Sequence, residues 1–126
     1  MKKVVAGLLL LIVLGIAFFA WRSKNLGNSK KLTESQEMLT AVTQGLQQFK
    51  LHNYKYPTTE QGLQALLKEP SGSRMWRGPY LSESQLKDSW GRAFQYEATQ
   101  AYGFRLVSSG PDGTFANDDD IVGTNF

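Results

Sequence analysis

The fold is decided by the stretch from Leu32 to Leu51, which reads LTESQEMLTAVTQGLQQFKL. Its apolar side chains recur at seven-residue spacing in two rows, Leu32, Leu39 and Leu46 in one and Val42 and Phe49 in the other. This spacing is typical of an amphipathic helix with one apolar stripe. A lone helix of this kind is marginal in water, so the stripe must pack on the C-terminal part of the chain or on another copy. A coiled-coil dimer is the second of these alternatives.

A strongly apolar segment precedes this helix. From Val4 to Trp21 there are 18 consecutive residues without a charge. At a rise of about 1.5 Å per residue, such a helix is long enough to cross the hydrocarbon core of a bilayer. Lys2 and Lys3 in front of it fit either a cleaved secretory signal or an uncleaved anchor. Because aromatic residues extend the run as far as Trp21, we expect an uncleaved anchor.

The orientation of this anchor follows from two opposing signals. Four basic residues follow the apolar run and two precede it, so the positive-inside rule alone places the C-terminal part in the cytoplasm. A short two-lysine leader, however, is how exported chains begin, and we expect an extracytoplasmic head. The polar residues 22–31 include Gly27 and Asn28, and we expect the helix to loosen there.

Composition excludes several classes of function. Of 126 residues, 14 are basic and 11 are acidic. Beyond residue 21 there are 12 basic and 11 acidic residues, so this part of the chain is close to neutral and nucleic acid is not an expected partner. Cysteine is absent and His52 is the single histidine, which excludes disulfides, thiolate zinc sites and two-histidine metal clusters. No nucleophile-elbow glycine pattern surrounds a serine, so we expect His52 to flank a helix end instead of acting as a catalytic base.

Downstream, the helix is expected to end at Asn53, because Pro57 disfavours helical geometry in the residue before it. Thr58 and Gln61 form a capping box that predicts a short second helix, ending near Lys68. The loop of residues 69–79 is irregular and is expected to be pinned by Trp76.

Two short strands are predicted after this loop. Apolar and polar residues alternate around Phe94 and Tyr96, and again from Tyr102 to Leu106, with a connection at residues 99–101. Asp88 is placed to accept backbone N–H groups in the turn before the first strand. From Gly110 onward we find no regular periodicity.

The C-terminal segment carries most of the negative charge. Residues 110–126 hold four aspartates, no lysine and no arginine; the aspartates are Asp112, Asp118, Asp119 and Asp120. Clustered carboxylates repel one another, so the loop either holds a cation or is a solvated acidic tail. Oxygen ligands with glycines and an asparagine are typical of calcium sites. No EF-hand glutamate follows, and no apolar pocket supports a paired-carboxylate glycosidase.

Five segments in one order resemble the major pseudopilins of bacterial type II secretion systems. They are distributed over roughly residues 54–126 and read YPTTEQGL (56–63), GPYL (78–81), DSWG (88–91), GPDG (110–113) and DDDI (118–121). The resemblance implies a pilin-like α+β fold. In that fold a long N-terminal helix, membrane-spanning in its first half, packs on a small antiparallel sheet with a calcium-binding C-terminal loop.

The resemblance also implies the site and the organisation of the chain. One structural calcium ion would be held by Asp112 and by the aspartate run Asp118, Asp119 and Asp120, with the Ser109 carbonyl as a backbone ligand; which of the three aspartates bind stays open. We expect a basic N-terminus (1–3), a transmembrane signal anchor (4–21), an amphipathic helix (22–53) and a head domain (54–126).

The function implied is that of a non-enzymatic subunit. Such subunits are anchored in the bacterial inner membrane by a single span, with the head in the periplasm, and form a filament for protein export. The implied partners are like subunits, other pseudopilins and the inner-membrane secretion platform.

The N-terminus departs from the family pattern. A prepilin peptidase cuts after a glycine, and the fifth residue of the mature chain is a glutamate. Here Gly7 is followed by leucines, the fifth position is Ile12, and the first acidic residue is Glu34. Processing by a prepilin peptidase is therefore not expected. A non-polymerising, membrane-anchored binding module that reuses the pseudopilin head is the second hypothesis.

Overall fold

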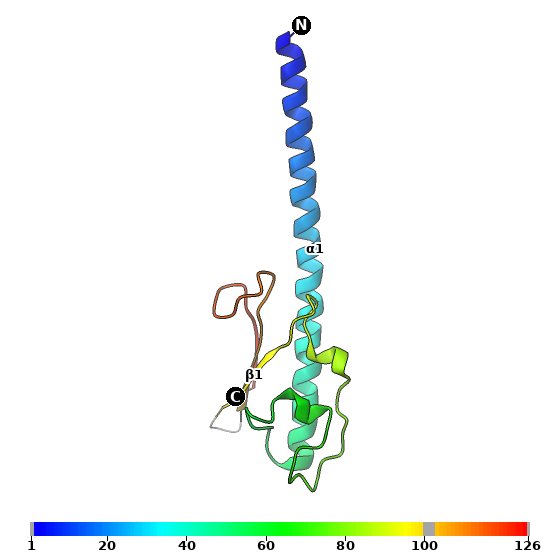
Figure 1. Ribbon diagram of the computed structural model, residues 1–126, viewed down its shortest axis with the longest axis vertical. Coiled ribbons are helices and arrows are strands. Elements are labelled where there is room, and N and C mark those ends of the chain that lie inside the picture. Colours follow the sequence, from blue (N-terminus) through cyan, green and yellow to red (C-terminus); the bar gives the residue numbers. More distant parts are fainter. Residues whose placement is uncertain (1, 100–102, 126) are drawn as a thin grey trace. The chain divides into compact units, whose positions relative to one another are not determined.

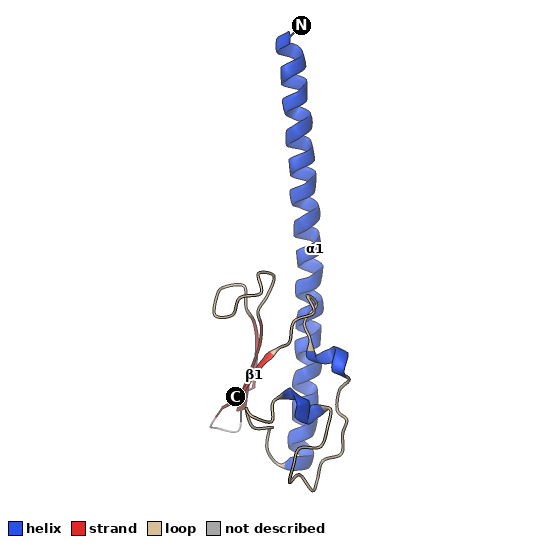
Figure 2. Cartoon of the chain, viewed as in Figure 1, coloured by secondary structure: helices blue, strands red, loops and turns tan. Residues whose placement is uncertain are grey.

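The computed structural model of the chain describes residues 2–99 and 103–125. Its elements in order are α1 (Lys2–Asn53), η1 (Leu63–Leu66), η2 (Glu83–Leu86), β1 (Gln95–Thr99), β2 (Gly103–Ser108) and β3 (Ile121–Asn125) (Figure 1, Figure 2). The chain divides into two compact units, residues up to Lys31 and residues from Leu32 onward. Helix α1 contributes residues to both.

The first unit consists of the N-terminal part of α1. By length and composition, α1 is the one described helix with a segment apolar enough to cross a membrane. The large apolar side chains from Leu9 to Trp21 are between 52% and 74% exposed, whereas a core helix of a soluble protein would bury them.

The predicted loosening of the helix at residues 22–31 is wrong, because α1 continues through this stretch. The Ser29 hydroxyl donates to the Asn25 carbonyl one turn earlier at 3.0 Å. Arginine, lysine and leucine are good helix formers, and a single Gly27 costs only about 1 kcal/mol.

In the second unit, the apolar stripe of α1 forms one wall of the core. Leu39, Val42, Leu46 and Phe49 are between 0% and 5% exposed. Burial of each such side chain contributes about 1.5–3 kcal/mol. They pack in one cluster with residues from the rest of this unit, among them Leu66, Phe94, Phe104 and Leu106. The stripe therefore packs within the chain, as predicted, and α1 ends at Asn53 as predicted.

The predicted second helix is shorter than expected. Both bonds of the capping box form, from Thr58 N–H to Gln61 Oε1 (3.0 Å) and from Gln61 N–H to Thr58 Oγ1 (3.1 Å). Gly62 then takes φ +59°, a left-handed conformation that stops regular helix, and only the 3-10 helix η1 follows. Leu63 and Leu66 of this short helix are nevertheless buried in the core.

The loop of residues 69–79 is irregular and is held by Trp76, as expected. The Trp76 indole donates to the Ala65 carbonyl at 2.8 Å, and its ring meets Tyr80 edge-on at 5.8 Å. Tyr80 in turn lies 3.0 Å from Nδ1 of His52, which sits in the last turn of α1. His52 thus flanks the helix end, where we predicted it.

The sheet has three antiparallel strands in the order β1-β2-β3. Strands β1 and β2 confirm the predicted pair, with Tyr96 opposite Leu106; residues 100–102 of the predicted connection lie outside the described residues. Strand β3 was not predicted. It pairs along β2, with Gly123 opposite Leu106, and Gly123 faces Leu39 and Thr43 of α1. A glycine at this inward position removes the alternation that would indicate a strand.

Candidate functional site

The acidic segment forms a loop between two paired strands. It leaves β2 after Ser108 and returns as β3 at Ile121, so the sheet brings its two ends together. In Figure 1 the loop is the orange segment beside α1 within the second unit. Ser108 and Ser109, at its root, are 0% and 1% exposed.

A buried carboxylate supports this root. Oδ1 of Asp88 accepts the backbone N–H groups of Trp90 (3.0 Å) and Arg92 (2.9 Å), which confirms the turn predicted there. Its Oδ2 accepts the hydroxyl of Ser108 at 2.8 Å, and Ser108 Oγ accepts the N–H of Gly110 at 3.3 Å. Asp88 therefore links the turn before β1 to the first residues of the loop.

Arg92 from the same turn is a functional residue that the sequence did not reveal. Its Nη1 donates to the Gly110 carbonyl at 2.6 Å and its Nη2 to the Pro111 carbonyl at 3.4 Å. The guanidinium also lies against Gly113, where an added Cβ would stand 2.8 Å from Cζ. The Arg92 guanidinium thus places a positive charge at the root of a loop that carries four carboxylates.

Two of the predicted ligands, Asp112 and Asp120, accept hydrogen bonds from other residues of the loop. The Asp112 carboxylate accepts the N–H of Thr114 (2.8 Å) and the side-chain amide of Asn117 (2.6 Å). Oδ2 of Asp120 accepts the N–H of Ala116 at 2.8 Å. Its other oxygen, Oδ1, is buried and has no hydrogen-bond partner among the described residues.

The other two aspartates lie on the outside. Asp118 and Asp119 are exposed, and only the backbone of Asp119 takes part in holding the loop, through its N–H to Asn117 Oδ1 at 3.1 Å. The Asp119 carbonyl packs on Gly110, which takes φ +62° and where any Cβ would collide with that oxygen.

The structure therefore separates the predicted site residues into two groups. The carboxylates of Asp112 and Asp120 accept hydrogen bonds from the loop itself, the buried Ser109 lies at its root, and Asp118 and Asp119 are exposed on its surface. Within residues 2–99 and 103–125, no three acidic or histidine side chains gather closely enough to hold a metal by themselves.

The comparisons with known proteins decide the family. Residues 23–124 match the family model described as type II secretion system (T2SS), protein G. The chain belongs to this family. The resemblance predicted from the five segments is thereby confirmed.

Individual relatives extend the match over most of the chain. Type II secretion system core protein G of Aeromonas hydrophila is 32% identical over 125 residues, covering 94% of this chain and 87% of the relative. The protein of the same name in Klebsiella pneumoniae is 33% identical over 121 residues, covering 90% and 86%.

The fold comparison agrees with the sequence. The crystal structure of the major pseudopilin from the type 2 secretion system of enterohaemorrhagic Escherichia coli superimposes with a TM-score of 0.66 at 30% identity. The alignment covers 79% of this chain and 90% of that one. The predicted pilin-like fold, a long N-terminal helix with a small antiparallel sheet, is confirmed.

Proposed function

We propose that this protein is a non-enzymatic pseudopilin subunit that assembles with like subunits into a filament of a type II secretion apparatus. The observation that carries the proposal is the match of residues 23–124 to the family. The fold agrees with it, because the helix α1 has an apolar N-terminal segment and contributes its later residues to the core of the second unit. The relatives that match over most of the chain are named core components of that system.

The arrangement of the titratable groups supports a structural role over a catalytic one. His52 lies 3.0 Å from Tyr80 Oη, between the end of α1 and the loop that Trp76 holds. Asp88 is buried and accepts three hydrogen bonds that fasten the turn to the sheet. Both groups are engaged in holding the fold.

We further propose that the segment up to Trp21 anchors the subunit in the inner membrane and that the head lies in the periplasm. Exposed apolar side chains along this part of α1 support the anchor, because they would be costly to leave in water. The periplasmic head is the location implied by membership of a secretion family.

We also propose that the loop binds one calcium ion, with Asp112, Asp120 and backbone oxygens near Ser109 as its ligands. The proposed ligand atoms are all oxygens, which suits a hard cation. Oδ1 of Asp120 is buried and accepts no hydrogen bond among the described residues, so it is available to an ion. Bound calcium would neutralise part of the loop's negative charge. Asp118 and Asp119 are the less suitable ligands because, within the described residues, their carboxylates accept none of the hydrogen bonds that orient Asp112 and Asp120 in the loop.

The filament proposal is tested by producing the full chain together with a prepilin peptidase and a type II secretion apparatus. A filament subunit is expected to sediment as a polymer and to give crosslinked ladders. A protein that stays monomeric in the membrane under these conditions would overturn the proposal.

The non-polymerising module remains the second candidate, and a specific observation favours it. Ile12 stands where the family pattern has a glutamate. The N-terminal sequence and intact mass of the protein recovered from membranes distinguish the two. Loss of the first seven residues together with ladders supports the filament, whereas an uncut monomer supports the module.

A further inference from the structure

Charge is distributed unevenly over the second unit. Residues 50–77 carry five cations and two anions, a net charge of +3, whereas residues 110–126 carry four anions and no cation, a net charge of −4. Figure 1 shows that the two segments are separated along the part of α1 that belongs to the second unit: the orange acidic loop lies toward the N-terminal end of this part, and the green segment lies at its C-terminal end. The head is therefore electrically polar along this direction.

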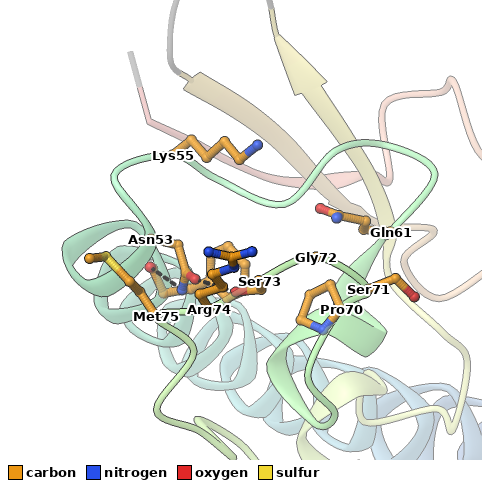
Figure 3. Close-up of a pocket in the computed structure, with 10 residues that line it drawn as sticks. Asn53, Lys55, Gln61, Pro70, Ser71, Gly72, Ser73, Arg74 and Met75 are labelled. Atoms are coloured by element: carbon orange, nitrogen blue, oxygen red, sulfur yellow. Dashed lines mark hydrogen bonds between the residues drawn. The ribbon is translucent and has the colours of Figure 1, made fainter.

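A cleft of about 160 Å³ lies in the basic segment (Figure 3). Its base is held by a hydrogen bond of 2.6 Å from the Ser73 hydroxyl to Asn53 Oδ1. Lys55, from the segment after α1, and Arg74, from the loop that follows η1, both line it and are both exposed. Met75, also a lining residue, is 54% exposed. The residues that line the cleft, all of them described, include no acidic side chain.

The outer face of the acidic loop has the complementary character. Phe115 is 40% exposed, and Asp118 and Asp119 are exposed beside it in sequence. The loop itself is held by the hydrogen bonds that Asp112 and Asp120 accept and, at its root, by Arg92. It therefore presents an aromatic ring and two carboxylates on a backbone that is already ordered.

We propose that the Phe115–Asp119 face of the acidic loop in one copy docks into the Lys55–Arg74 cleft of a second copy of this chain. The inference rests on the proposed function, since a filament brings copies together. An exposed aromatic residue entering a small cleft between two cations has the chemistry of an interface anchor, with cation–π contacts available to both cations. The opposed charges set register and orientation more than affinity.

The electrostatics also determine which kind of pairing can form. Two clefts, or two acidic loops, repel each other, so a two-fold symmetric contact through either surface is disfavoured. A contact between two different surfaces is heterologous, and it propagates into an open assembly unless the rotation between copies closes a ring. Because the two surfaces are separated along α1, the paired copies are staggered along this helix.

The test uses the full-length chain in membranes. Because the sequence contains no cysteine, every disulfide formed by this chain must involve an introduced cysteine. Thr114→Cys on the loop and Ser71→Cys at the cleft, both at exposed positions, are combined in one chain and oxidised under filament-forming conditions. The expected product is a ladder of dimers, trimers and higher species. The control pair Thr114→Cys with Ser84→Cys, on the exposed face of η2, is expected to give no ladder.

Charge reversal in the same background separates this contact from a folding defect. Arg74→Asp is expected to reduce the ladder about tenfold, because an attractive pair becomes repulsive, and Asp118→Arg in the same chain is expected to restore it. Any of three results would overturn the proposal. These are a ladder that Arg74→Asp leaves unchanged, an equal ladder from the Ser84 control, and a crosslink from Ser71→Cys to a protein of different mass. Sedimenting polymer without the ladder refutes this contact alone, whereas the loss of polymer with every pair refutes the filament.

Discussion

Arg92 shows how one side chain can decide the conformation of a loop far away in sequence. Its guanidinium bonds the carbonyls of Gly110 and Pro111, 18 and 19 residues further on, and covers Gly113. A planar fork suits two neighbouring carbonyls, and a positive charge at this place opposes the repulsion among the aspartates.

Arg92→Ala is therefore expected to lower the free energy of unfolding by about 1.5–3 kcal/mol, the range for hydrogen bonds to a charged group. Arg92→Lys keeps the charge but loses the fork, and an intermediate loss is expected. Urea unfolding of the full chain in detergent measures the stability, and hydrogen exchange over residues 109–120 measures the loop. Arg105→Ala, at an exposed position of β2, is the control and should change neither. Equal effects of the Arg92 and Arg105 substitutions would contradict this role.

Tyr96 makes the stability of the head depend on alkaline pH. Its hydroxyl donates to the Pro57 carbonyl at 2.8 Å in the core. Burial raises the pKa of Tyr96 well above its ordinary value, and the neighbouring Tyr56 adds to the shift. Above about pH 10 the unfolded chain loses this proton while the folded chain keeps it, so stability falls as the pH rises.

The expected slope approaches about 1.4 kcal/mol per pH unit above about pH 10 and is absent at neutral pH. Urea unfolding at a series of alkaline pH values should show a shallower decline for Tyr96→Phe than for the wild type. Tyr54→Phe, at a position 75% exposed, is the matched control and should keep the wild-type slope. If all three proteins decline in parallel, Tyr96 is not responsible.

At the scale of elements, the acidic loop is an ordered connection whose aspartates have different tasks. The carboxylates of Asp112 and Asp120 accept hydrogen bonds from other residues of the loop, whereas Asp118 and Asp119 are exposed. The proposed calcium ion would stabilise the folded head by about 2.7 kcal/mol when its concentration is a hundred times the dissociation constant.

Addition of calcium to chelator-treated full-length protein is therefore expected to raise the melting temperature. Asp120→Asn is expected to abolish this rise, because Oδ1 of Asp120 is the buried acceptor without a partner. The same change at exposed Asp118 should leave most of the rise in place. If calcium does not change the melting temperature, the proposed calcium site is wrong. If both variants lose the calcium-dependent rise to the same degree, the proposed difference between Asp120 and Asp118 as ligands is wrong.

The elements that can be predicted from sequence alone are those in which buried side chains recur at the regular spacing of a helix or a strand. The stripe of α1 and the alternation around Tyr96 and Phe104 are visible because each buries one regular face. Strand β3 escaped prediction because Gly123 occupies its inward position, and Val122, 48% exposed, points outward. For β3 the pairing with β2 replaces the missing pattern.

The candidate site was predictable only in its composition. Four aspartates between residues 112 and 120 are visible in the sequence, but which of them accept hydrogen bonds from the loop depends on its backbone, with Ala116 at φ +69°. The contacts of Arg92 with backbone carbonyls leave no residue pattern to recognise. The cleft between Lys55 and Arg74 likewise forms from segments that only the fold brings together.

At the scale of the whole molecule, one chain combines a segment suited to lipid with a head suited to water. The run that ends at Trp21 exposes its apolar side chains, whereas the second unit buries Leu39, Val42, Leu46 and Phe49 of the same helix. The same element therefore has to satisfy two solvents, and the change between them falls within the polar residues 22–31. Charge placed on either side of this change should have opposite consequences.

Leu11→Arg combined with Leu14→Arg is expected to release the protein from membranes, because each arginine near the centre of a spanning helix costs about 2.5–3.5 kcal/mol on insertion scales. Asn25→Arg combined with Leu26→Arg adds the same two charges beyond the apolar run and is expected to leave membrane attachment unchanged. Leu14 and Leu26 are similarly exposed, 56% and 64%, so the comparison isolates position along α1 from the loss of an exposed leucine. Extraction of membranes with alkaline carbonate measures the attached fraction for each variant. If both pairs release the protein to the same degree, attachment depends on something other than burial of residues 4–21 in lipid.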